Sequence, residues 1–184
     1  IEHSFEIIKS SRLDNKKDFK NILICGMGGS AIGGDFVKTI VSNELNIPFY
    51  VNRTYDLPKW VSNDTLIVIC SYSGDTEETI SCFNQAKKSN RTPIIISSGG
   101  YILENAISNN YDFVKLPKGI QPRAAFGYSA SLLLLLLVKL DVIDKKYSNN
   151  LIDSIDEIEK KSKQLSLIND NNPALIFASK ISVK

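Results

Sequence analysis

Histidine is almost absent from this sequence, since His3 is the only one among 184 residues. The sequence also lacks the spacing of histidine, cysteine and acidic residues that is typical of a metal site, so we expect no bound metal. His3 stands in the opening segment, far from every motif described below. We therefore expect it on the surface, without a part in the chemistry of the protein.

Cysteine is scarce as well, and no apolar run is long. Cys25, Cys70 and Cys82 form an odd set without paired spacing, which is typical of a protein in a reducing cytoplasm. Even the run of six leucines, Leu132–Leu137, is far shorter than the roughly 20 apolar residues of a transmembrane helix. No secretory signal opens the sequence. We expect a cytoplasmic protein that has no membrane partner.

The sequence has no excess of charge of one sign. Its formal net charge is +2, and its lysines and arginines are dispersed rather than clustered. A nucleic-acid partner is therefore not expected. Hydrophobic residues make up 43% and charged residues 23% of the chain, as in ordinary globular proteins, and the length suits roughly one domain.

Short apolar runs rich in β-branched residues recur along the chain and alternate with helical patterns. They predict strands near residues 22–25, 48–52, 65–70, 93–97 and 113–116. Strands that alternate with helices form a parallel sheet whose two faces are both covered. The predicted fold class is therefore α/β, a three-layer sandwich around a parallel sheet.

Four helical segments lie outside this alternation. Residues 1–17 predict a short helix with Phe5 and Ile8 turned inward. The six leucines predict either a wholly buried helix or a dimer interface. Residues 151–165 have the pattern of an amphipathic helix, and residues 170–173 are expected to cap a further helix.

The stretch from Cys70 to Ile80 is the most informative part of the sequence. A buried strand ends there in Ser71, Ser73, Gly74 and Thr76, and a helix follows to about Ser89. Free N–H groups of a first helical turn and the helix dipole favour an anion at such a position. Three hydroxyls would add neutral donors. The alternative is that Ser73 or Thr76 serves only as an N-cap.

A second candidate turn is the glycine-rich run that follows the first predicted strand. It is not a phosphate-binding P-loop, because no Lys-Ser or Lys-Thr pair closes it. It fits the loose dinucleotide fingerprint, with Arg53 placed for a 2′-phosphate. We favour a close-approach turn in which Gly28, Gly29 and Ser30 face a ligand. Gly33 and Gly34 would let the helix lie tight against a strand, and packing alone remains an alternative for the whole run.

Arg123 stands where a helix is expected to begin, just before the leucine run. A cation is unfavourable at that end of a helix dipole. It therefore needs either an anionic ligand or a structural carboxylate as its partner.

Three motifs together resemble one family. Residues 26–35, 71–79 and 121–128 are similar to the motifs of the bifunctional phosphoglucose/phosphomannose isomerases, a family within the sugar isomerase (SIS) domain superfamily. The resemblance implies two SIS domains, each with a flavodoxin-like parallel sheet. It implies that residues 1–150 form the first domain and that residues 151–184 form a helical connection toward a second.

The resemblance also implies a role for each candidate residue. The phosphate of a hexose 6-phosphate would be bound by six residues: Gly28, Gly29, Ser30, Ser71, Ser73 and Thr76. Arg123 would stabilise the enediolate during isomerisation of glucose, fructose and mannose 6-phosphates. No cofactor is implied, and the parent protein would be a homodimer of glycolysis and gluconeogenesis. The alternative is a sugar-phosphate binding or regulatory SIS module without catalysis.

The sequence departs from this family in what it does not contain. The general base of the family is a glutamate of the second domain, and the histidine and lysine that assist ring opening also lie beyond the first. His3 does not match that histidine, and Glu77 and Glu78 are expected to be partners of a helix dipole. We therefore expect this chain alone to be inactive.

Overall fold

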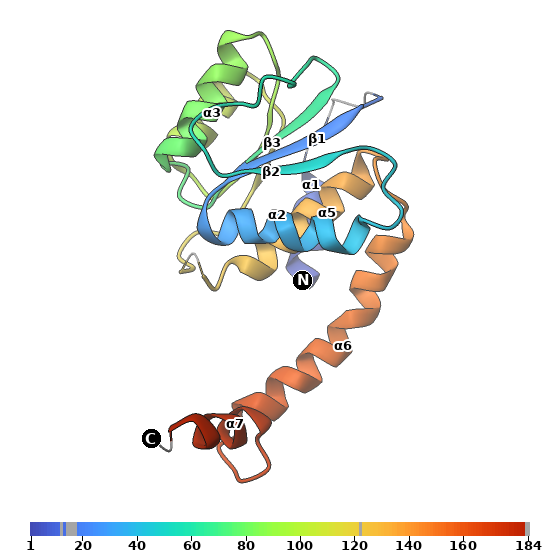
Figure 1. The fold of residues 1–184 in the computed structure, drawn as a ribbon, viewed down its shortest axis with the longest axis vertical. Coiled ribbons are helices and arrows are strands. Elements are labelled where there is room, and N and C mark those ends of the chain that lie inside the picture. Colours follow the sequence, from blue (N-terminus) through green and yellow to red (C-terminus); the bar gives the residue numbers. More distant parts are fainter. Residues whose placement is uncertain (12, 14–17, 122, 183–184) are drawn as a thin grey trace.

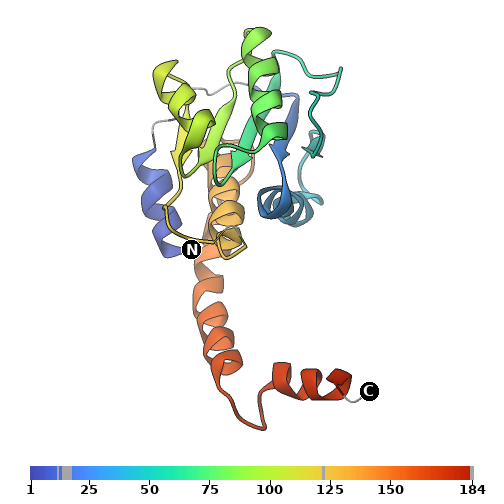
Figure 2. The same cartoon turned by 90° about the vertical axis from the view of Figure 1, so that its left-hand side faces the viewer.

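Five parallel strands form a single sheet in the computed structural model, which describes residues 1–11, 13, 18–121 and 123–182. The strand order is β2-β1-β3-β4-β5, and helices cover both faces, as Figures 1 and 2 show. The predicted α/β three-layer sandwich is therefore confirmed. The strands are β1 (Asn21–Gly26), β2 (Phe49–Asn52), β3 (Thr65–Ser71), β4 (Ile94–Ser97) and β5 (Phe113–Lys115). The helices are α1 (Glu2–Ser10), α2 (Gly28–Val41), α3 (Glu77–Lys88), α4 (Gly100–Ser108), α5 (Phe126–Lys139), α6 (Lys146–Ser166) and α7 (Pro173–Ser182).

Side chains of each central strand alternate between two apolar clusters. Ile22 and Ile24 of β1 join the cluster beneath α1, α2 and α5, whereas Leu23 and Cys25 join the cluster beneath α3 and α4. This alternation follows from the two-residue period of a strand. Because both faces are buried, the strands could be recognised as nearly continuous apolar runs.

The six leucines of α5 are buried within this chain. Each of Leu132–Leu137 is 5% exposed or less, and the helix packs on the sheet beside α1 and α2. Of the two interpretations of this run, the buried helix is therefore confirmed. The leucines leave no apolar surface for a second copy.

The two internal glycines of α2 lie at close contacts, against a strand as predicted for Gly34 but against a helix for Gly33. A Cβ added to Gly34 would lie 3.2 Å from a methyl of Val51 and 3.3 Å from a methyl of Ile24. A Cβ added to Gly33 would lie 3.2 Å from the Cβ of Ser129 on α5. Small residues here let α2 approach both the sheet and its neighbouring helix.

The opening helix is shorter than predicted, and His3 is not remote from the motifs. α1 ends at Ser10, and Ser11 is already extended; residues 12 and 14–17 of the predicted helix lie outside the described residues. Ile8 is buried as expected. Because α1 lies against the first turns of α5, the exposed His3 hydrogen-bonds through Nδ1 with the hydroxyl of Tyr128 at 2.9 Å. The expectation of a surface histidine is therefore confirmed, but in space His3 lies next to Tyr128 of the third motif.

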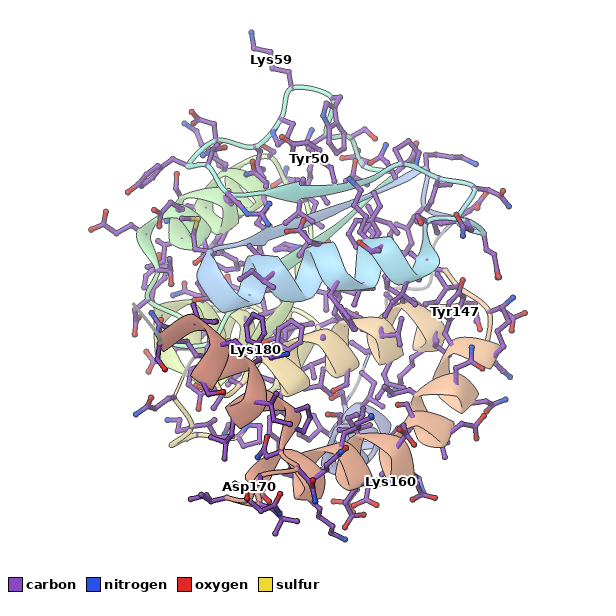
Figure 3. The ribbon with its side chains drawn as sticks, turned by 60° about the horizontal axis from the view of Figure 1, so that its bottom comes forward. Tyr50, Lys59, Tyr147, Lys160, Asp170 and Lys180 are labelled. Atoms are coloured by element: carbon purple, nitrogen blue, oxygen red, sulfur yellow. The ribbon has the colours of Figure 1, made fainter. Side chains whose placement is uncertain are left out.

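α6 leaves the α/β body, and α7 lies at its far end (Figures 1 and 2). Tyr147 marks the start of α6 on the body and Lys160 a point further along it (Figure 3). Leu151 is half-buried, whereas Leu165 is 48% exposed, so only the first part of the amphipathic stripe packs on the body. Asn172 caps α7, because its Oδ1 accepts a hydrogen bond from the N–H of Ala174 at 2.9 Å. In the described part of the chain, no helix combines the length and apolarity needed to cross a membrane.

Candidate functional site

Two turns lie side by side at the carboxyl ends of β1 and β3. The two strands are neighbours, and Gly26 is paired in register with Cys70. A Cβ added to Gly26 would lie 3.2 Å from the carbonyl oxygen of Cys70, so the backbones of β1 and β3 approach closely just before both turns. Figure 1 shows the starts of α2, α3 and α5 at this same edge of the sheet. The sequence predicted that both turns open at this edge of the sheet, and the topology confirms their position.

Both helices that begin here lack a side-chain cap. Met27 is the N-cap residue of α2 and Thr76 that of α3, and neither helix receives a cap hydrogen bond from a side chain. The first N–H groups of each helix therefore remain able to bind a ligand, and both dipoles favour an anion. The interpretation of Thr76 as only an N-cap is wrong, because its hydroxyl does not serve the helix.

The hydroxyls of the turn after β3 make hydrogen bonds within the turn itself. Ser71 Oγ accepts from the N–H of Gly74 at 3.1 Å and donates to Thr76 Oγ1 at 3.2 Å. Ser73 Oγ accepts from the N–H of Asp75 at 3.2 Å. Among the described residues, the protons of Ser73 and Thr76 have no acceptor, whereas the proton of the buried Ser71 has one. Ser73 is exposed and Thr76 is half-buried, so a ligand can reach both.

The turn after β4 packs against the turn after β3. Gly74 has φ of 79°, and a Cβ there would lie 1.8 Å from the carbonyl oxygen of Gly99. Gly100 has φ of 71°, and a Cβ there would lie 2.3 Å from the carbonyl oxygen of Ser73. Only glycine fits at either position, because both the backbone angle and the space exclude a side chain. The two turns therefore pack backbone against backbone.

Asp75 links the same two turns through its side chain. Its Oδ1 accepts a hydrogen bond of 2.8 Å from the N–H of Tyr101, in the first turn of α4. The N–H of Ile102 donates to the carbonyl oxygen of Gly74 at 3.1 Å. Sequence reasoning missed this contribution of Asp75. The available signal was the pair Gly99-Gly100 at the start of α4, which marks a close approach of backbone.

The turn after β1 has a different geometry. Gly28 has φ of 51° and is exposed, and no atom lies within 4 Å of an added Cβ. Its glycine is therefore required by backbone angle rather than by space. Gly29 and Ser30 are half-buried in the first turn of α2. The three candidate residues of this turn thus stand at the uncapped helix start.

Arg123 lies in the turn that leads into α5, two residues before the N-cap Ala125. Gln121 closes this turn, because its carbonyl oxygen accepts from the N–H groups of both Ala124 and Ala125. Arg123 is exposed, and among residues 1–11, 13, 18–121 and 123–182 no carboxylate forms an ion pair with it. The described residues thus provide no structural carboxylate as a partner of Arg123.

Two other charged residues near this edge have side-chain partners, and a third was not predicted from the sequence. Arg53 forms an ion pair with Asp35 of α2, so the arginine of the dinucleotide alternative is already engaged. The carboxylate of Glu77 accepts from the hydroxyl of Tyr55 at 3.1 Å, and this hydrogen bond raises the pKa of Tyr55. Lys118 was missed: it is exposed, and its Nζ lies 3.4 Å from the position of a Cβ on Gly99.

No metal-binding group of three or more histidine, cysteine, aspartate or glutamate side chains occurs among the described residues. All three cysteines are buried free thiols. The chemistry that the described edge offers is therefore that of backbone N–H groups, neutral hydroxyls and two exposed cations, Arg123 and Lys118.

Comparisons with known proteins agree with this geometry. Residues 17–119 match the SIS domain family. The chain is 41% identical over 167 residues to the bifunctional phosphoglucose/phosphomannose isomerase of Caldicellulosiruptor bescii. This match covers 90% of the chain and 47% of that protein. It is 37% identical over 150 residues to the protein of the same name from Aquifex aeolicus. This match covers 80% of the chain and 47% of that protein. The chain thus spans about half the length of the curated relatives that it matches.

A solved structure shares the fold at low identity. The C-terminal domain of glucosamine-fructose-6-phosphate aminotransferase from Francisella tularensis superposes with a TM-score of 0.57 at 19% identity. The match covers 90% of this chain and 56% of that one. At this identity the likeness concerns the fold alone.

Proposed function

The chain belongs to the SIS domain family, and on this premise we propose that it is the N-terminal half of an aldose–ketose isomerase of hexose 6-phosphates. Its substrates are glucose 6-phosphate and fructose 6-phosphate, with mannose 6-phosphate as a second aldose. The relatives named above support this activity, since both are named as phosphoglucose/phosphomannose isomerases. Residues 1–150 form the first SIS domain, and residues 151–184 lead toward a second.

One observation carries the proposal: two helices without a side-chain cap start at adjacent strand ends, and the turn before α3 offers two hydroxyl protons that have no acceptor among the described residues. This arrangement suits the dianionic phosphate of the substrate, which accepts from N–H groups and hydroxyls. Ser73 and Thr76 donate directly to the phosphate. Ser71 stabilises the turn through its hydrogen bonds to Gly74 and Thr76. Its hydroxyl donates to the phosphate once ligand binding has rearranged the turn. Gly28, Gly29 and Ser30 bind from the neighbouring turn.

Arg123 acts on the charge that appears during the reaction. Isomerisation moves a proton from C2 of the aldose to C1 of the ketose through an enediolate, so negative charge develops on an oxygen of the sugar. Arg123, which has no carboxylate partner among the described residues, stabilises that charge more than it stabilises the neutral carbonyl. The base that takes the proton and the groups that open the ring come from the second half of the parent protein, so this chain alone is inactive.

The remaining features of the proposal concern the whole protein. The parent enzyme is a cytoplasmic homodimer that works in glycolysis and gluconeogenesis. The reaction is a proton transfer within one molecule, and it requires neither a cofactor nor a resident metal.

Binding of glucose 6-phosphate to the chain, measured by calorimetry, tests the phosphate turn. Ser73→Ala should weaken binding by about 1 kcal/mol or more, since a hydrogen bond to a charged group is worth roughly 1.5–3 kcal/mol. Ser89→Ala is the matched control, because Ser89 stands at the opposite end of α3. Unchanged binding by Ser73→Ala would refute the phosphate-turn assignment. Lack of turnover by the full-length protein would instead favour the non-catalytic binding module.

A further inference from the structure

Tyr72 lies between two candidate phosphate ligands, yet its hydroxyl contacts a different part of the chain. The hydroxyl donates to the carbonyl oxygen of Pro117 at 3.0 Å and accepts from the N–H of Ile120 at 2.8 Å. Residues 117–120 follow β5 and lead directly into the turn that carries Arg123. One side chain therefore joins the turn after β3 to the segment that places the arginine.

The backbone of Tyr72 is fixed independently of its hydroxyl. Its carbonyl oxygen accepts from the N–H of Ser98 at 3.1 Å and from Ser98 Oγ at 2.6 Å. Its half-buried ring packs against the apolar cluster beneath α1, α2 and α5. The Tyr72 side chain is thus a spacer of defined length: Ser98 fixes its backbone, and residues 117–120 bind its hydroxyl.

Pro117 and Ile120 of the segment that Tyr72 contacts are half-buried, and its other two residues face solvent. Lys118 and Gly119 are exposed, and Gly119 adopts φ of 83°. In the part of the chain that the structure describes, the Tyr72 hydroxyl is the only side-chain group with a hydrogen bond to residues 117–120. The hydroxyl satisfies a donor and an acceptor of that segment at once. Its loss would leave the segment without a fixed distance from the phosphate turn.

We infer that Tyr72 is a positioning residue, which sets the distance between the phosphate turn and Arg123. The inference rests on the proposed function, because it requires that Arg123 acts on the reacting sugar. With the phosphate held at one end of the substrate, the arginine must meet an oxygen at the other end. A misplacement of about 1 Å in such a constellation can cost about a hundredfold in rate.

The test is Tyr72→Phe in the full-length protein, which removes the hydroxyl and keeps the ring and its packing. We expect kcat for conversion of fructose 6-phosphate to glucose 6-phosphate to fall at least about tenfold. KM and the inhibition constant of inorganic phosphate should change less than about twofold, since the N–H groups and hydroxyls of the turn remain. Tyr50→Phe is the matched control, because Tyr50 lies exposed on β2 (Figure 3).

A double-mutant cycle identifies the group through which Tyr72 acts. In an Arg123→Ala background, Tyr72→Phe should lower kcat no further, because the residue that it positions is gone. An equal loss of kcat in both backgrounds would overturn the inference, as would a rise of KM and of the phosphate inhibition constant at unchanged kcat. Stabilisation of each variant by inorganic phosphate, followed as the unfolding midpoint, provides a readout that is independent of turnover.

Failure of the inference is distinguishable from failure of the proposed function. If the full-length wild-type protein does not isomerise hexose 6-phosphates, the proposed function and the inference that rests on it are both wrong. If it does, the variants alone decide the role of Tyr72.

Discussion

At the scale of single residues, the thiol of Cys70 stands one position before the turn that binds the phosphate in our proposal. It is 4% exposed and lies between the paired residues Gly26 of β1 and Ile96 of β4. Burial raises the pKa of this thiol from an ordinary 9.0 to about 12. The thiol is therefore neutral and unreactive at physiological pH, which keeps an anion away from the end of β3.

Stability should consequently fall in alkali through Cys70. Above pH 9.0 the thiol ionises in the unfolded chain but stays protonated in the folded one until about pH 12. The unfolded state then binds fewer protons, so the free energy of unfolding decreases between these values and is insensitive to Cys70 below them. Urea unfolding at about pH 8 and about pH 10.5 measures the decrease, and Cys70→Ala should reduce it. An equal decrease in both proteins would contradict this, since lysines and tyrosines titrate alike in the two.

Candidate site residues were predictable where the side chain and its neighbours in sequence define the local structure. The positions of Ser71, Ser73 and Thr76 at a strand end before a helix could be predicted, because an apolar run precedes them and a helical pattern follows. The roles of Tyr72 and Asp75 could not, because their partners lie 45 and 26 residues further along the chain. Which hydroxyl protons are free also depends on contacts within the folded turn.

At the scale of elements, the N-terminus of α4 depends on a residue from another segment. Gly99 is its N-cap residue and has no side chain, so Asp75 supplies the acceptor for the N–H of Tyr101. A negative side chain also suits this end of the helix dipole. The capping interaction thus ties α4 to the turn after β3.

Removal of this cap should destabilise the protein moderately. Asp75→Ala should lower the free energy of unfolding by about 0.5–2 kcal/mol, the usual cost of a lost N-cap. Asp75→Asn should cost less, because its amide oxygen still accepts the hydrogen bond from Tyr101. Urea denaturation of the two variants makes the comparison. Equal losses would show that the carboxylate charge, rather than the acceptor, stabilises α4.

The strands were predictable to within one or two residues. The central strands β1, β3 and β4 are buried on both faces and read as apolar runs, whereas β2 and β5 each carry one exposed residue, Tyr50 and Lys115. Helix ends were less accessible to sequence reasoning. α1 ends at Ser10 rather than near residue 17, and α5 begins at Phe126 rather than beside Arg123. In the second case the carbonyl oxygen of Gln121 accepts two N–H groups and so holds the preceding residues in a turn. A turn of this kind has no periodicity that a sequence pattern reveals.

At the scale of the whole molecule, an apolar stripe on α2 lies open to solvent. Ile32, Phe36 and Ile40 recur at every fourth residue and are 55%, 49% and 40% exposed. Phe36 stacks edge-to-face on Phe126 at 5.6 Å between ring centroids, beside a groove of about 530 Å³ that α6 also lines. This surface, and not the buried leucine run, is the part of the body suited to contact another protein surface.

The isolated chain should therefore self-associate through the stripe on α2. Contiguous exposed apolar patches larger than a few hundred Å² are usually contact sites, and a second copy is the partner always present in a purified sample. Phe36→Asp should shift the chain toward monomer, because association would then bury an unpaired carboxylate. Tyr101→Asp is the control, since Tyr101 is 41% exposed on α4, beyond the opposite face of the sheet. Light scattering over a concentration series measures the mass, and a monodisperse wild-type monomer at high concentration would rule out this use of the stripe.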